Sequence, residues 1–191
     1  MFLTRRPSPR KIEQFIEESH RLPHSYAPIG IAEQVPSDFN FDQASGTVGR
    51  GREAFERAKR ALTEWRHFDL GWVELFPRGA AIEPGSVVAV LVRHLAFWSL
   101  NGCRVVYTLG DRRTAPGFGF AYGTLTNHAE MVEEIFEVSL VPDSAEVVYR
   151  IRAVSKPRAA LARIGYPMTR LLQARFRRDS ISALRHAINE A

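Results

Sequence analysis

The spacing of apolar residues changes near Leu70, and that change constrains the fold more than any other feature. Over residues 55–65 apolar side chains recur every three or four positions, as in an amphipathic helix. After Leu70 apolar and polar residues alternate instead, which is the pattern of half-buried β-strands. The sequence therefore predicts a helix followed by a sheet.

Six strand-like segments follow Leu70. Short breakers such as Asn101-Gly102 and Pro142-Asp143 separate most of them, and connections this short favour antiparallel hairpins over crossover helices. In residues 146–154 apolar residues alternate with Arg150 and Arg152, so one face of that strand is apolar and the other largely solvated. The predicted strands are Trp72–Phe76, Val87–His94, Arg104–Leu109, Gly117–Thr124, Val132–Val141 and Glu146–Val154.

Three further elements complete the predicted order. A weaker strand pattern covers Phe39–Val48, and a short helix begins at Ser8 or Pro9. A long C-terminal helix begins at Pro157, is interrupted over residues 165–167 and then continues with an apolar stripe. We predict an α+β domain over residues 39–191, in which a curved seven-stranded antiparallel sheet grips the long C-terminal helix. Residues 1–38 form an N-terminal arm packed on it.

Composition narrows the class of protein. The chain has 191 residues with 45% hydrophobic and 25% charged residues, which is typical of one globular domain. The single cysteine, Cys103, cannot form an internal disulfide, and the longest apolar run, Val87–Val92, is far shorter than the ~20 residues of a membrane helix. With no signal-peptide pattern at Met1–Arg6, we expect a cytoplasmic protein.

The run from Gly119 to Phe136 carries the most chemical information. Glycines at positions 119 and 123 flank an aromatic strand, and a strand glycine commonly permits a bulge or the close approach of another chain or a ligand. Beyond that strand, His128, Glu130, Glu133 and Glu134 place an imidazole and three carboxylates within seven residues.

These side chains have two interpretations. In the first, His128, Glu130 and Glu134 are catalytic groups that transfer protons on a bound substrate. In the second, Thr124 and His128 cap turns of a polar hairpin, while the glutamates pair with arginines. A fixed metal site normally needs three protein ligands, and His128 and Glu130 supply two, so we expect no metal and no cofactor.

Aromatic residues are dense on the predicted strands, and they either form an ordinary core or line a hollow. If they line a hollow, a few polar side chains would orient a ligand there. The predicted ligand-binding residues are Arg104, Tyr107, Phe120, Tyr122, Thr124 and Arg150.

Several separated motifs resemble uncharacterised protein family 0548. They are the run 119–136, the approach to a helix at Val48–Gly51, Cys103–Tyr107, Ala153–Pro157, and the pair Arg170 and Gln173. The order of elements is similar to the helix-grip fold of the Bet v 1 and START-like superfamily. That resemblance implies an apolar cavity between sheet and helix, which in this superfamily takes lipids, steroids or other hydrophobic molecules.

Three functions therefore stay open. The leading hypothesis is that the protein binds a hydrophobic small molecule between the sheet and the C-terminal helix. The second is an enzyme that uses His128, Glu130 and Glu134. The third is an interaction module that uses an arginine-rich helix face to contact nucleic acid or an anionic membrane surface. With a net charge of only +5 and no basic tail, we do not expect nucleic acid or a membrane surface as the main partner. The arginines of that face are Arg170, Arg175, Arg177, Arg178 and Arg185.

Overall fold

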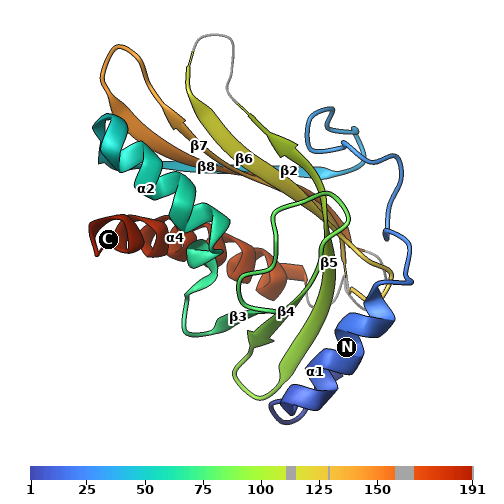
Figure 1. The fold of residues 1–191 in the computed structure, drawn as a ribbon. Helices are drawn as coiled ribbons and strands as arrows, with labels where there is room; N and C mark the ends of the chain where they lie inside the picture. The colour runs from blue at the N-terminus through green and yellow to red at the C-terminus, as the bar shows by residue number, and fades with distance from the viewer. Residues whose placement is uncertain (111–114, 129, 158–165, 191) are drawn as a thin grey trace.

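The computed structural model describes residues 1–110, 115–128, 130–157 and 166–190, and Figure 1 shows their arrangement. Seven antiparallel strands form a curled sheet in the order β2-β8-β7-β6-β5-β4-β3, and a two-residue strand, β1, pairs with β5. The predicted α+β architecture, a curved sheet with a long C-terminal helix against it, is confirmed. The strands are β1 (Phe2–Leu3), β2 (Asn40–Arg50), β3 (Val73–Phe76), β4 (Val87–Arg93), β5 (Trp98–Leu109), β6 (Gly117–Thr124), β7 (Glu130–Leu140) and β8 (Glu146–Pro157).

The helices lie on both sides of this sheet (Figure 1). Helix α2 (Gly51–Thr63), the 3₁₀ turn η1 (Arg66–Phe68) and helix α4 (Tyr166–Asn189) cover the concave face, whereas α1 (Pro9–Ser19) lies on the convex face. Helix α1 begins as the sequence predicts, because the side chain of Ser8 accepts a hydrogen bond from the backbone N–H of Lys11.

The main core fills the space between the concave face and the helices. Its centre is a group of edge-on aromatic rings, in which Trp65 lies 4.8 Å from Phe120 and Phe120 lies 5.3 Å from Phe136, measured between ring centroids. Helix α4 approaches β2 closely, since a Cβ on Gly46 would lie 2.8 Å from Ile181. Close packing therefore seals this end of the sheet and helix sandwich.

Residues 1–38 cover the convex face. Ile12 and Phe15 of α1 pack against Leu91 and Leu100 of the sheet, and a second cluster joins Tyr26, Ile31 and Ala32 to β6, β7 and β8. Gly123 permits this contact, because a Cβ there would lie only 2.0 Å from the hydroxyl oxygen of Tyr26. The group that approaches this strand glycine is the chain's own N-terminal segment, rather than another chain or a ligand.

A buried carboxylate fastens this segment to the sheet. Glu133 has no solvent exposure, and its Oε2 accepts hydrogen bonds from the Tyr26 hydroxyl at 2.7 Å and the Gly30 N–H at 2.9 Å. Its Oε1 accepts from the Ala32 N–H at 3.0 Å and the Tyr107 hydroxyl at 3.3 Å. Each oxygen thus has two donors, as a buried charge requires.

Two element boundaries differ from the prediction. Strand β5 begins at Trp98 rather than Arg104, because Asn101-Gly102 is not a turn. A Cβ on Gly102 would lie 2.5 Å from Asn127 Oδ1, so this glycine permits a close contact within the strand. Pro157 ends β8 instead of beginning a helix, and the helical piece predicted after it falls on residues 158–165, outside the described residues.

Candidate functional site

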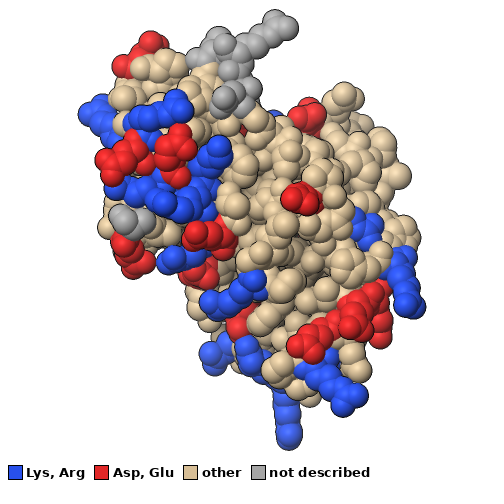
Figure 2. Space-filling model, in the orientation of Figure 1, with Lys and Arg blue, Asp and Glu red and all other residues tan. Residues whose placement is uncertain are grey.

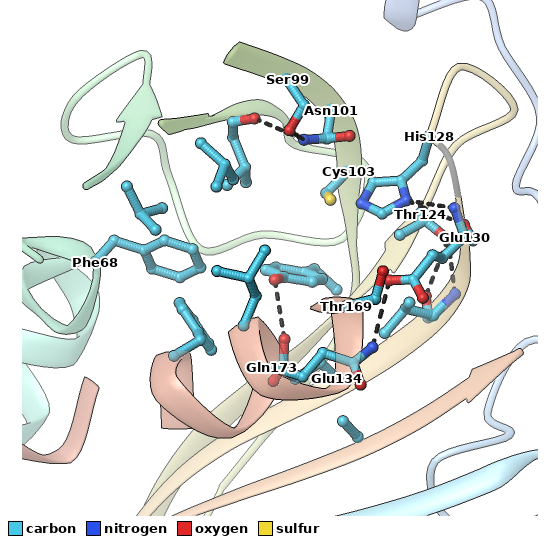
Figure 3. A pocket seen from close by; sticks show the side chains of 18 of the residues that line it. Phe68, Ser99, Asn101, Cys103, Thr124, His128, Glu130, Glu134, Thr169 and Gln173 are labelled. Carbon is cyan, nitrogen blue, oxygen red and sulfur yellow. Dashed lines mark hydrogen bonds between the residues drawn. The ribbon is translucent and has the colours of Figure 1, made fainter. Parts of the chain in front are cut away.

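A cavity of about 220 Å³ lies between the concave face of the sheet and the N-terminal half of α4 (Figure 3). One wall is apolar and combines rings with aliphatic side chains from η1, β4 and α4. Polar groups from β5, β6, β7 and α4 line the rest. The lining residues are Phe2, Phe68, Trp72, Val73, Val90, Val92, His94, Ser99, Asn101, Cys103, Tyr122, Thr124, His128, Glu130, Val132, Glu134, Ala153, Thr169, Leu172, Gln173, Phe176 and Arg177.

Strand β7 supplies the acidic groups. Its residues alternate between faces, so Glu130, Val132 and Glu134 face the cavity while Glu133 faces the N-terminal segment. Figure 3 shows Glu130, Glu134 and Gln173 grouped where β7 faces α4, with Phe68 across the cavity. The cavity therefore has an acidic end and an apolar end.

Glu134 is only 8% exposed and has one hydrogen-bond partner among the described residues. The hydroxyl of Tyr122 donates to its Oε2 at 3.0 Å, and Oε1 accepts no hydrogen bond from any residue that the structure describes. Burial raises the pKa of Glu134 to about 7, and this effect outweighs the lowering by the Tyr122 hydrogen bond and by the charge of Arg177. The carboxyl group can therefore gain or lose a proton near neutral pH.

Glu130 and His128 lie beside it. The side-chain amide of Gln173 donates to Glu130 Oε2 at 3.3 Å, and burial raises the pKa of Glu130. Nδ1 of His128 lies 3.0 Å from the backbone N–H of Glu130 and 3.1 Å from the carbonyl oxygen of Glu130, so it can accept from the first or donate to the second according to the tautomer. Burial lowers the pKa of His128 to about 4, so the ring is neutral at pH 7.

The arginines nearest these carboxylates form ion pairs with a different residue, Asp42. Arg170 and Arg177 of α4 both donate to Asp42 on β2, the latter at 3.2 Å. Within the described ranges, neither Glu130 nor Glu134 forms an ion pair with a lysine or arginine. The acidic end of the cavity is thus held by neutral donors alone.

Strand β5 contributes a third polar wall. Asn101 donates from Nδ2 to the Ser99 hydroxyl at 3.1 Å and to the Val90 carbonyl at 3.3 Å, and its Oδ1 has no partner among the described residues. The thiol of Cys103 lies beside them and faces the cavity (Figure 3). Burial raises the pKa of this thiol, so it is a poor nucleophile at neutral pH.

The structure brings five of the nine predicted site residues to this cavity: Tyr122, Thr124, His128, Glu130 and Glu134. The hydroxyl of Thr124 on β6 accepts from the Val132 N–H of β7 at 2.9 Å, so it joins the two strands. The predicted pairing of the glutamates with arginines occurs at neither Glu130 nor Glu134, because the aspartate at 42 holds the available cations.

The other four predicted residues lie elsewhere. Phe120 faces the same side of the sheet but is packed inside the aromatic core, with no exposed surface. Arg104, Tyr107 and Arg150 point to the convex face: Arg104 donates to backbone carbonyls at the end of α1, Tyr107 binds Glu133, and Arg150 lies 3.6 Å from Glu137. A bulge between Val105 and Tyr107 shifts the alternation of β5, which places Tyr107 on that side.

Sequence reasoning missed Ser99, Asn101 and Gln173 as lining residues. The first two alternate with apolar residues in a strand that was predicted to start later, so their shared face was not visible. Gln173 belongs to the Arg170 and Gln173 motif, a signal that was present but had no assigned role.

The arginine-rich face of α4 is largely paired within the molecule. Arg185 donates to the Thr47 carbonyl, Arg175 and Arg178 bind Asp179, and the Arg175 guanidinium lies 4.5 Å from the centre of the Trp72 ring. Figure 2 shows acidic residues interspersed with basic ones on the face in view. This pairing weakens the hypothesis of an interaction module.

Two features are absent from the described residues. No helix among them is long and apolar enough to cross a membrane. No group of three or more His, Cys, Asp or Glu side chains among them is arranged to hold a metal ion.

A family model described as a domain of unknown function (DUF1990) matches residues 25–183. The chain belongs to this family. A UPF0548 protein of Dictyostelium discoideum is 33% identical over 98% of this chain and 96% of its own length, and one from Arabidopsis thaliana is 34% identical over 86% and 82%. The predicted resemblance to family 0548 is therefore confirmed.

One solved structure has a fold similar to that of this DUF1990 protein. Protein NE0264 from Nitrosomonas europaea superposes with a TM-score of 0.52 at 10% sequence identity, covering 82% of this chain and 97% of that protein. At this identity the likeness concerns the fold, so function has to be argued from the cavity.

Proposed function

We propose that this DUF1990 protein binds a small, largely apolar molecule in the cavity between its sheet and α4. One observation carries the proposal: about 220 Å³ of space, walled by apolar side chains and ending in a few polar groups, lies between the sheet and α4. Small-molecule sites combine these features, because apolar walls supply affinity and a few placed polar groups orient the ligand. Phe68, Leu172 and Phe176 form the apolar side.

Binding of a fluorescent hydrophobic probe tests this proposal. N-phenylnaphthylamine carries no charge at neutral pH and becomes fluorescent in apolar surroundings, so titration into the protein should give a saturable increase. Ala153 lines the cavity opposite Glu134 on the adjacent strand. Ala153→Phe should fill the cavity and weaken probe binding at least about tenfold, which corresponds to roughly 1.4 kcal/mol.

Val148→Phe is the matched control, because Val148 lies on the same strand but on the other face. It should leave probe affinity unchanged. Thermal unfolding of both variants shows that each is folded. Linear, unsaturable fluorescence with the unaltered protein, or equal affinity in both variants, would refute the cavity as the binding site.

A second candidate is an enzyme that performs acid–base chemistry in the same cavity. Glu134 favours it, since a carboxyl group with a pKa of about 7 and an unpartnered Oε1 can accept or donate a proton at neutral pH. Small ketones that fit the cavity would exchange their α-protons for solvent deuterium faster with the protein than with Glu134→Gln. Exchange at the protein-free rate across such a panel, followed by NMR, would remove this candidate.

A further inference from the structure

The acidic end of the cavity determines which polar group a ligand would carry. Oε1 of Glu134 and Oε1 of Glu130 have no hydrogen-bond partner there among the described residues, and both are acceptors. Glu134 is more than nine-tenths buried and lines the cavity. A carboxylate oxygen that faces a cavity without a donor from the protein is complementary to a ligand group that carries donors.

The charges around the two glutamates also favour a ligand group that carries donors. Asp42 holds both Arg170 and Arg177, so these cations do not pair directly with the two glutamates. Ionised Glu130 and Glu134 would therefore gain from a cation supplied by a ligand. A metal ion fits poorly, because no cluster of three ligating side chains is present among the described residues and most of the wall is apolar.

We infer that the ligand of this cavity is a hydrophobic amine, whose protonated nitrogen faces Glu134 and Glu130 and whose apolar body lies against Phe68, Leu172 and Phe176. This inference rests on the proposed function. It adds the class of ligand: an ammonium group offers donors and a positive charge that can bind the two carboxylates directly, whereas Arg170 and Arg177 bind Asp42, and charge-assisted hydrogen bonds are stronger than neutral ones.

Competition between three molecules of matched shape tests the inference. Octylamine, octanol and octanoate share one apolar chain and differ in a cationic, neutral or anionic head group. Each is used at pH 8 to displace N-phenylnaphthylamine from the protein. Octylamine should displace the probe at a concentration at least about tenfold lower than octanol, and octanoate should be the weakest, because a charge-assisted hydrogen bond contributes more than a neutral one.

Two variants show which carboxylate causes the preference for octylamine over octanol. Glu134→Gln keeps the shape of the side chain but removes its charge, so octylamine should then compete no better than about threefold more strongly than octanol. Glu146→Gln removes the same charge from the start of β8, away from the residues that line the cavity, and should keep the full preference. Displacement of the probe by octanol, measured in each variant, shows whether the cavity is intact.

The outcomes separate this inference from the proposed function. If the probe does not bind, the proposed function fails. If the probe binds but octanol or octanoate competes as well as octylamine, the cavity binds hydrophobic molecules and the amine inference is overturned. An amine preference that survives in Glu134→Gln would equally overturn the assigned role of that carboxylate.

Discussion

Glu133 and Glu134 are neighbours on β7, are both buried, and do different things. Glu133 faces the N-terminal segment, where four donors satisfy its two oxygens. Glu134 faces the cavity, where one hydroxyl binds one oxygen and the other oxygen has no partner among the described residues. A buried carboxylate whose donors all come from its own chain is part of the fold. One that leaves an acceptor open to a cavity is available to a ligand.

The convex and concave faces differ in the same way. On the convex face, residues 1–38 fill the surface with side chains and with backbone donors. On the concave face, α4 packs closely against β2 but leaves space beside β5 and β7. The N-terminal segment therefore covers the convex face of the sheet, whereas the concave face keeps a cavity beside its packed core. The predictions below test this difference, from the largest expected effect to the smallest.

Glu133→Gln should destabilise the protein by about 4 kcal/mol, because the new amide turns a donor toward groups that are themselves donors. Urea denaturation measures this loss. The same substitution at Glu134 is the control, since it sits next in the chain but faces space, and it should cause no comparable loss. A change smaller than about 1 kcal/mol at Glu133 would contradict the structural role of its four hydrogen bonds.

Glu134→Gln should instead stabilise the protein, and only at higher pH. Burial raises the pKa of Glu134 from 4.5 to about 7, so the folded state binds a proton that the unfolded state releases between these values. The free energy of unfolding of the wild-type protein therefore falls as pH rises from about 4.5 to 7, because the folded protein must then ionise the buried Glu134. Relative to wild type, the variant should gain about 2–3 kcal/mol at pH 8 and almost nothing at pH 4.

Urea denaturation of both proteins across that pH range measures the difference directly. The groups that act on the Glu134 titration are Tyr122, Arg177, Asp42, Glu130, Cys103 and Tyr149, and they are present in both proteins. A stability difference that does not vary with pH would show that Glu134 is not protonated in the folded protein near neutrality.

The sequence predicted the sheet well, because most strands show alternation or clear breakers. It named Glu134 and not Glu133 as a catalytic candidate, but no local pattern marks which of the two faces a cavity. Residues 132–138 of β7 are all buried, so both faces of this strand are covered and the sequence contains no polar face to mark the outside. Which glutamate meets the cavity depends on the sheet's direction of curl and on the segment behind it, both of which arise from contacts distant in sequence.

The polar wall on β5 was hidden for a different physical reason. Asn101-Gly102 has the composition of a turn, yet the glycine serves a close contact with Asn127 inside a continuous strand. Local composition favours the turn, and tertiary packing overrides it. With β5 started at Arg104, the alternation of Ser99, Asn101 and Cys103 on one face could not be recognised.

Octylamine binding should weaken about tenfold between pH 8 and pH 6. An alkylamine stays protonated throughout, as a lysine side chain does, so the change comes from Glu134, which is mostly ionised at pH 8 and mostly protonated at pH 6. Probe displacement at each pH gives the affinity. Octanol binding should not depend on pH in this range. In Glu134→Gln, octylamine binding should also become independent of pH. Tighter octylamine binding at pH 6 would exclude Glu134 as the group that faces the nitrogen.

Tyr107→Phe should have the smallest effect, and it separates the two faces most directly. The hydroxyl of Tyr107 donates to Glu133 at 3.3 Å on the convex face, beside shorter bonds from Tyr26 and two backbone N–H groups. Its removal leaves each Glu133 oxygen with a donor, so urea denaturation should show a loss of only about 0.5–1 kcal/mol.

Probe affinity in Tyr107→Phe should equal that of wild type, because Tyr107 does not line the cavity. Tyr122→Phe is the counterpart on the concave face. It removes the only hydrogen-bond donor to Glu134 among the described residues, so the pKa of Glu134 should rise and the pH dependence of octylamine binding should move upward. If Tyr107→Phe altered ligand affinity as strongly as Tyr122→Phe, the two faces of the sheet would be coupled, and the separation of a structural glutamate from a ligand-facing one would not hold.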